Sequence, residues 1–167
     1  MATFLPADLS GHVSANFATI DQLVAATGLR PVLDFDDTTD ESAIGSRVLP
    51  LTYDGGGLTV KVHGSMAGAN TAKTMSFDVA IERVAAAALL TAGGSDFAAA
   101  NNANPTVHAD ADKEFSFEVA FTDGADMDSL AAGEPYRILF KRDADGTTST
   151  DDAVGDFQLL TASLRES

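Results

Sequence analysis

Apolar and polar residues alternate along most of the chain after Arg30, and this spacing of two is typical of β-strands with one buried face. The alternation is most regular in segment 113–122, where one face carries Phe115, Phe117, Val119 and Phe121. The pattern predicts seven or eight strands in total. The clear ones lie at 31–35, 43–51, 58–63, 75–84, 113–122, 136–141 and 157–165.

The last of these strands differs from the others because it has apolar residues on both faces. Simple alternation places Phe157 and Leu159 on one face and Leu160, Ala162 and Leu164 on the opposite one. A strand that is apolar on both faces is typical of the centre of a sheet or of an interface. We therefore expect this strand to be central or to line an interface.

Strands with one apolar face need a second layer to cover that face, so two sheets must pack against each other. The connecting segments are rich in Asp and in turn-forming residues, and lie at 36–42, 64–73, 93–111 and 143–152. The longer connections suit a Greek-key or jelly-roll path better than a simple meander. The sequence therefore predicts an all-β protein, an antiparallel β-sandwich of the jelly-roll or Greek-key type.

The first 29 residues are weakly patterned and are interpreted as an N-terminal arm, with the β-sandwich spanning 30–167. Within the arm, segment 21–28 could form a short helix, with Asp21 near its start and Gly28 as its stop. Two interpretations stay open: the arm is a surface tail, or it packs on a neighbouring subunit.

The chain is strongly acidic, with 25 Asp and Glu residues against 10 Lys and Arg and a formal charge of −15. Binding to nucleic acid depends on Lys and Arg, so no nucleic-acid partner is expected. Anionic membranes would repel the chain, and no apolar run approaches the length of a spanning helix. We also see no signal peptide. The absence of cysteine excludes disulfides and thiol chemistry.

No catalytic constellation is visible, so we do not expect an enzyme. The three histidines, His12, His63 and His108, are far apart in sequence, and their spacing is not that of a cupin metal site. The chain has neither the Gly-x-Ser-x-Gly motif of a nucleophile elbow nor a phosphate-binding glycine loop. The many acidic residues make chance carboxylate pairs inevitable, so they do not point to a glycosidase.

Acidic clusters raise the possibility of calcium, which binds oxygen ligands from flexible loops. One cluster lies within 34–41, and a second contains Asp143, Asp145 and Asp151. The second cluster does not have the spacing of an EF-hand, and its alternative interpretation is a solvated hairpin turn. No cofactor is expected apart from this possible calcium.

Four segments carry a resemblance to a known class of protein. They are VLDFDDTTDE at 32–41, LPLTYDGGGLTV at 49–60, FDVAIER at 77–83, and the stretch from DSLAAGEPYR at 128–137 to KRD at 141–143. Together they resemble small jelly-roll proteins encoded among bacteriophage structural genes. The match runs from about Arg30 to the C-terminus, and its motifs are turns and strands.

The resemblance implies a phage virion protein, most of all a head decoration or cement protein. Such proteins often sit as trimers on the outer capsid surface, where they bridge and stabilise subunits of the major capsid protein. The chain would then be a homotrimer assembled in the host cytoplasm and located on the virion. The family has no catalytic residues to transfer to this sequence.

A carbohydrate- or receptor-binding module of a phage tail or head fibre is the alternative. The absence of Trp, the presence of only Tyr53 and Tyr136, and the placement of most phenylalanines on core faces all argue against an aromatic sugar platform. For the decoration protein, exposed apolar residues would form the interface. The residues chosen on this basis are Phe4, Leu5, Leu9, Val13, Phe17, Leu160 and Leu164.

Overall fold

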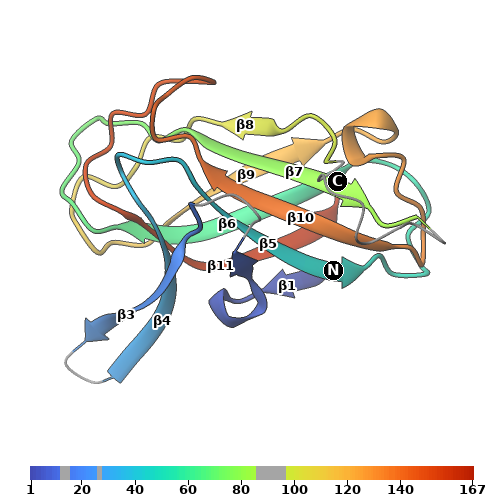
Figure 1. Ribbon diagram of the computed structural model, residues 1–167, viewed down its shortest axis with the longest axis horizontal. Coiled ribbons are helices and arrows are strands. Elements are labelled where there is room, and N and C mark those ends of the chain that lie inside the picture. Colours follow the sequence, from blue (N-terminus) through green and yellow to red (C-terminus); the bar gives the residue numbers. More distant parts are fainter. Residues whose placement is uncertain (12–15, 26–27, 86–96) are drawn as a thin grey trace.

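The computed structural model describes residues 1–11, 16–25, 28–85 and 97–167. Within this part of the chain, two antiparallel sheets pack face to face as a jelly-roll β-sandwich (Figure 1). All seven clear strands of the sequence prediction are present. The fold class is therefore confirmed.

The first sheet has the order β3 (Thr19–Ala25), β4 (Gly28–Phe35), β11 (Phe157–Glu166), β6 (Leu58–Met66) and β9 (Phe115–Phe121), and β1 (Ala2–Phe4) also pairs with β11. The second sheet has the order β2 (Ser10–Gly11), β5 (Glu41–Val48), β10 (Pro135–Arg142), β7 (Phe77–Arg83) and β8 (Asn101–Ala103). Two single-turn 3₁₀ helices complete the described elements: η1 (Pro6–Asp8) and η2 (Ala125–Met127).

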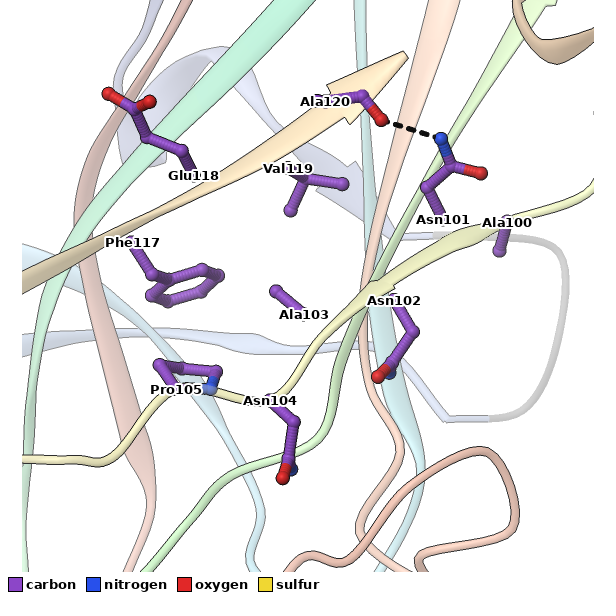
Figure 2. A pocket seen from close by; sticks show the side chains of 10 residues that line it. All are labelled: Ala100, Asn101, Asn102, Ala103, Asn104, Pro105, Phe117, Glu118, Val119 and Ala120. Atoms are coloured by element: carbon purple, nitrogen blue, oxygen red, sulfur yellow. Dashed lines mark hydrogen bonds between the residues drawn. The ribbon is translucent and has the colours of Figure 1, made fainter. Parts of the chain in front are cut away.

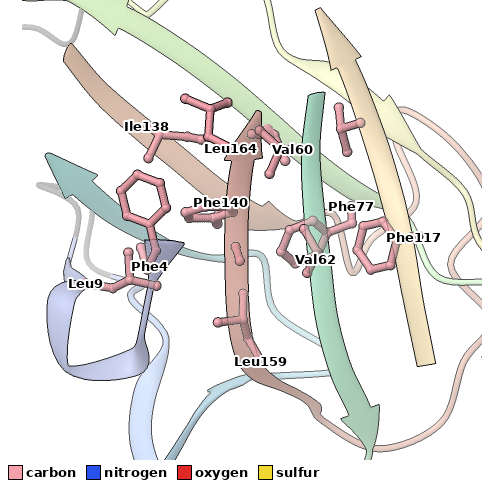
Figure 3. Close-up of a cluster of buried hydrophobic side chains, with 14 of the residues drawn as sticks. Phe4, Leu9, Val60, Val62, Phe77, Phe117, Ile138, Phe140, Leu159 and Leu164 are labelled. Carbon is pink, nitrogen blue, oxygen red and sulfur yellow. The ribbon is translucent and has the colours of Figure 1, made fainter. Parts of the chain in front are cut away.

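Phenylalanine side chains from both sheets fill the space between the layers (Figure 3). Phe77 of the second sheet meets Phe157 and Phe117 of the first edge to face, with ring centroids 5.3 and 5.5 Å apart. Such arrangements are the favoured geometry for aromatic pairs. The alternating faces predicted from the sequence therefore do form one continuous core.

Strand β11 contains an irregularity that changes the prediction for its two faces. Its pairing with β6 shifts register between Leu159 and Thr161, so one extra residue is inserted there. The insertion reverses the alternation, and both Leu159 and Ala162 point into the core. The prediction that β11 has two apolar faces was thus wrong. The β-bulge places Leu164 on the buried face that also carries Phe157 and Leu159.

The N-terminal segment contributes strands to both sheets. β1 pairs with β11 through Phe4 and Ala162, and β2 pairs with β5. The predicted short helix at 21–28 was wrong, because the described residues of this segment belong to β3 and to the start of β4. A helix of that length is marginal alone, whereas β4 supplies β3 with a main-chain partner over its whole length.

Strands β3 and β4 form a two-stranded ribbon that extends beyond the sandwich (Figure 1). β4 pairs with β11 only from Leu33 to Phe35. Beyond this point the neighbour of β11 is β1, which begins its pairing at Phe4. The rest of β4 has β3 as its partner.

None of the helices in the described ranges is long and apolar enough to cross a membrane.

Candidate functional site: a groove between two edge strands

The candidate site is an open groove where the two sheets end side by side. β8 is the last strand of the second sheet and β9 is the last strand of the first. The groove between them has a volume of about 690 Å³, and its lining comes from 100–105 and 117–120 (Figure 2). It is therefore built by two segments that are distant in sequence and that only the sandwich brings together.

Apolar side chains form the inner part of the groove. Figure 2 shows Phe117 and Val119 pointing from β9 towards β8, and Ala103 pointing back from β8. Phe117 is almost fully buried and stacks on Phe115 with 6.2 Å between ring centroids. The aromatic surface of the groove is thus fixed by the core beneath it.

Three asparagines supply the polar part of the lining. The amide of Asn101 donates to the Ala120 carbonyl at 2.7 Å and to an Asp126 carboxylate oxygen at 3.1 Å. The amide of Asn104 donates to the Met75 and Thr150 carbonyls. Within the described part of the chain, the side-chain oxygens of Asn101 and Asn104 accept no hydrogen bond. Both side chains are therefore held in place, and each keeps a free acceptor oxygen. Figure 2 shows Asn101 reaching towards β9 and Asn104 pointing away from Phe117 and Val119.

Asn102 is held by a denser network beneath the groove. Its amide donates to the Ser76 hydroxyl at 3.0 Å and to Asp78 at 2.8 Å, and its oxygen accepts from Ser149 at 2.8 Å. Burial raises the pKa of Asp78 above its ordinary value, and the Asn102 hydrogen bond opposes this effect. The network fixes the backbone of β8 as well as the side chain.

One charged side chain lies in the lining. Glu118 points to the other side of β9 from Phe117 (Figure 2) and receives two hydrogen bonds from Arg165, both of 3.1 Å. Both side chains are about half exposed, so this ion pair adds little to stability. Its consequence is local: the charge of Glu118 is balanced, in a chain that is otherwise strongly acidic.

The structure separates the three residues predicted as calcium ligands. Asp143 and Asp145 do lie together, with Asp40, and a carboxylate oxygen of each falls within 4.8 Å of the others. Lys141 already supplies a positive charge there, 2.6 Å from Asp40 and 3.6 Å from Asp143. Burial raises the pKa of Asp143, but hydrogen bonds from Thr148 and Thr147 and the Lys141 charge outweigh it and lower the pKa to about 2.

Asp151 is engaged elsewhere, and its assignment as a ligand was wrong. It holds the buried guanidinium of Arg142 through two hydrogen bonds of 2.9 and 3.0 Å. The remaining donors of Arg142 reach the carbonyls of Phe35, Ala153 and Gly155. A carboxylate that neutralises a buried cation in this way cannot also serve a metal without leaving that cation unpaired.

A second acidic group lies at the end of β4. Asp36, Asp37 and Asp156 each place an oxygen within 4.8 Å of the other two, a spacing that would suit a calcium ion. Asp36 and Asp37 already accept hydrogen bonds from the backbone, the latter from Gly155. Calcium binding stays a prediction at this group.

Asp34 is buried next to the second acidic group, and its Oδ1 atom has no hydrogen-bond partner. Burial is the main cause that raises the pKa of Asp34 to about 7. The nearby carboxylates of Asp21, Asp156 and Glu41 contribute to the same increase. This carboxyl group therefore titrates close to neutral pH.

The residues predicted as an interface differ widely in their exposure. Phe4, Leu9 and Leu164 are buried in the core, so their expected exposure was wrong. They are buried because β1, the η1 turn and the β11 bulge bring them between the sheets. Leu5 and Phe17 are half exposed, and Leu160 is partly buried. Val13 lies outside the described residues.

Sequence reasoning missed the groove, because the asparagines lie in what was interpreted as a loop at 93–111. The three-residue strand β8 is too short to show alternation.

The two tyrosines are buried, so neither forms an exposed platform. His63 contacts Glu114, whereas His108 accepts a hydrogen bond from the Asp110 backbone, so these two histidines are engaged separately.

Comparison with known proteins gives the fold but no family. No family model matches the chain, and no curated protein matches it. Among solved structures, it is similar to a family 35 carbohydrate-binding module from an environmental isolate, with a TM-score of 0.56, 11% identity, and coverage of 99% of this chain and 93% of that one. It is also similar to the K1 cleaved adhesin domain of Lys-gingipain from Porphyromonas gingivalis W83, with a TM-score of 0.54, 14% identity, and coverage of 99% and 98%.

Proposed function

We propose that the chain is a non-catalytic carbohydrate-binding module whose ligand occupies the groove between β8 and β9. The observation that carries the proposal is the lining of this groove, an apolar inner part beside asparagines whose oxygens are free to accept. Sugars present the same combination of apolar ring faces and hydroxyl donors. A carbohydrate-binding module is among the proteins with this fold, which supports the choice of ligand class.

The expected ligand is a neutral glycan. The chain carries a formal charge of −15, so uronic acids and sulfated sugars would be repelled. Sugar hydroxyls in the groove would donate to the oxygen of Asn101, and those at its rim to the oxygen of Asn104. The amide groups of these asparagines are already engaged, so little side-chain freedom would be lost on binding.

Recognition would rest on hydrogen bonds more than on stacking. Phe117 is the aromatic residue of the lining, and it is 8% exposed. A sugar ring could touch its edge but could not lie flat on it. We therefore expect weak affinity for a single sugar, with the groove accommodating part of an oligosaccharide.

A glycan array followed by calorimetry tests the proposal, with two neighbouring variants that add the same bulk and charge. Ala100 lines the groove, whereas Ala99 is exposed nearby and does not line it. We expect Ala100→Arg to weaken binding of a neutral oligosaccharide at least about tenfold and Ala99→Arg to leave it unchanged. Absence of binding to every neutral glycan, or equal binding by both variants, would contradict the proposal.

A second candidate function is the capsid decoration role that the sequence resemblance implies. The observation that favours it is the projecting β3–β4 ribbon, which exposes Ile20, Val24 and Leu29. Co-sedimentation with capsids of a phage that encodes the chain tests this role. Saturable binding at a fixed ratio to the major capsid protein would support it, and recovery of the chain only in the supernatant would count against it.

A further inference from the structure

The β3–β4 ribbon has one face that carries no ionisable side chain. The register pairs Ile20 with Leu33, Gln22 with Pro31, and Val24 with Leu29. Directly paired residues share a face, and alternate residues along each strand share it too. These six side chains therefore lie on one side of the ribbon, while Asp21, Arg30 and Asp34 lie on the other.

This uncharged face continues the inner face of the first sheet beyond the sandwich. Leu33 is buried in the core at the base of the ribbon. Beside it on the edge strand Ile20 is 65% exposed, and further along the ribbon Leu29 is 60% exposed and Val24 83%. These side chains thus lie in line with the core, but no strand of the second sheet covers them in the described part of the chain. A two-stranded ribbon is only marginally stable alone.

The distribution of charge along the chain indicates which partner can cover the uncharged face. Over residues 17–33 the formal charge is zero, because Asp21 and Arg30 cancel, so the whole charge of −15 resides in the rest of the chain. Two copies therefore repel each other over most of their surfaces. The uncharged face of the ribbon is a place where two copies can approach without that penalty, and apolar side chains on both would be buried together.

We propose that the uncharged face of the ribbon is a self-association surface, and that it packs against the same face of a second copy of this chain. The inference is independent of the proposed function. The contact is small, because seven paired residues at about 3.3 Å each give a ribbon roughly 23 Å long. It lies below the usual size of a stable interface, so the association is concentration-dependent, with an affinity in the micromolar range.

Light scattering after size-exclusion chromatography, over a range of concentrations, tests the inference. The wild-type mass should rise with concentration from 17.2 kDa, the mass of one chain, towards the mass of two chains. Val24→Asp places a charge on the uncharged face, and the matched control Leu23→Asp places it one residue away, on the opposite face beside Arg30. We expect the first variant to stay monomeric and the second to associate like the wild type.

The following results from light scattering would overturn the inference. They are a wild-type mass of one chain at all concentrations, association that survives Val24→Asp, and an equal loss in both variants. Circular dichroism of each variant separates loss of association from loss of folding, and if Val24→Asp fails to fold, Val24→Ser replaces it with the same expected result. A monomer that binds capsids or vesicles through the ribbon would assign another occupant to the face, and would therefore also overturn self-association.

Discussion

Two buried ionisable side chains, Arg142 and Asp34, differ in how well their polar atoms are hydrogen-bonded. The guanidinium of Arg142 has a carboxylate and three carbonyls as acceptors, so burial leaves it fully paired. The carboxyl of Asp34 has an oxygen without a partner and negative neighbours. Substitutions at these two residues should therefore have opposite effects on stability.

The first concerns Asp34 and pH. Because its pKa is raised from 3.8 to about 7 on folding, the folded state holds the proton more tightly between these values. Stability conferred by this group is therefore lost as the pH rises towards 7. Asp34→Asn is neutral at every pH, and its amide can donate to Asp21. We expect it to match the wild type near pH 4 and to exceed it at pH 8 by about 1–2 kcal/mol in the free energy of unfolding.

Thermal melts at the two pH values, in the presence of a chelator, check this expectation. Asp36→Asn is the control, because hydrogen bonds from Thr38 and Thr39 lower the pKa of Asp36 and its charged form is the stabilising one. This control should lose stability at pH 8. A variant at Asp34 that melts no higher than the wild type at pH 8 would show that the carboxylate is not destabilising.

The second concerns Arg142. Substitution by Met keeps much of the side-chain volume but leaves the Asp151 carboxylate buried without its cation. Breaking a buried ion pair by removing one partner typically costs about 3–5 kcal/mol. We expect a loss of this size for Arg142→Met in urea unfolding, and a smaller loss for the double variant Arg142→Met with Asp151→Leu. If the double variant is the less stable of the two, the unpaired Asp151 carboxylate is not the source of the loss.

At the scale of elements, the N-terminal strand β1 belongs to the core. The ring of Phe4 lies edge to face with Phe140 at 5.9 Å, and Arg47 covers it at 4.8 Å. Gly45 makes room for it, because a Cβ at that position would lie 2.7 Å from the ring. This local fit explains why a segment that reads as an arm in the sequence is integrated in the sandwich.

The third prediction separates a core strand from an arm. Phe4→Ala should lower the free energy of unfolding by about 3–5 kcal/mol, the range for large-to-small changes in a core. Leu5→Ala, next in sequence and half exposed, should change it by less than about 0.5 kcal/mol. Chemical denaturation of both variants provides the measurement. Equal and small effects would mean that β1 detaches readily and behaves as the arm first inferred.

The sequence predicts strands well where alternation is long, as in β9, because one buried face imposes a period of two. It predicts the N-terminal part poorly, since β1 and β2 are two or three residues long and depend on β11 and β5 for pairing. The sequence also does not reveal the bulge in β11. With strict alternation, Ala162 and Leu164 are assigned to the face opposite Leu159, whereas the inserted residue returns them to the same face. The groove depends on β8 and β9 meeting at one edge, and no local pattern encodes that meeting.

At the scale of the whole molecule, the two proposed surfaces lie at opposite edges. The ribbon ends the first sheet on one side, and β9, which builds the groove, ends it on the other. Copies that associate through their ribbons would therefore keep their grooves open. Several weak sugar sites in one assembly bind a multivalent glycan surface more tightly than any single site does. Weak self-association and weak sugar binding would thus reinforce each other.

A nuclear magnetic resonance titration of the labelled chain with a neutral oligosaccharide selected on the array would locate the bound sugar directly. We predict that the side-chain amides of Asn101 and Asn104 and the backbone amides of Phe117 and Ala120 shift together and saturate. Signals of the ribbon should not respond. Shifts confined to the ribbon or to other loops, with the groove signals unchanged, would contradict the assignment of the groove as the carbohydrate site.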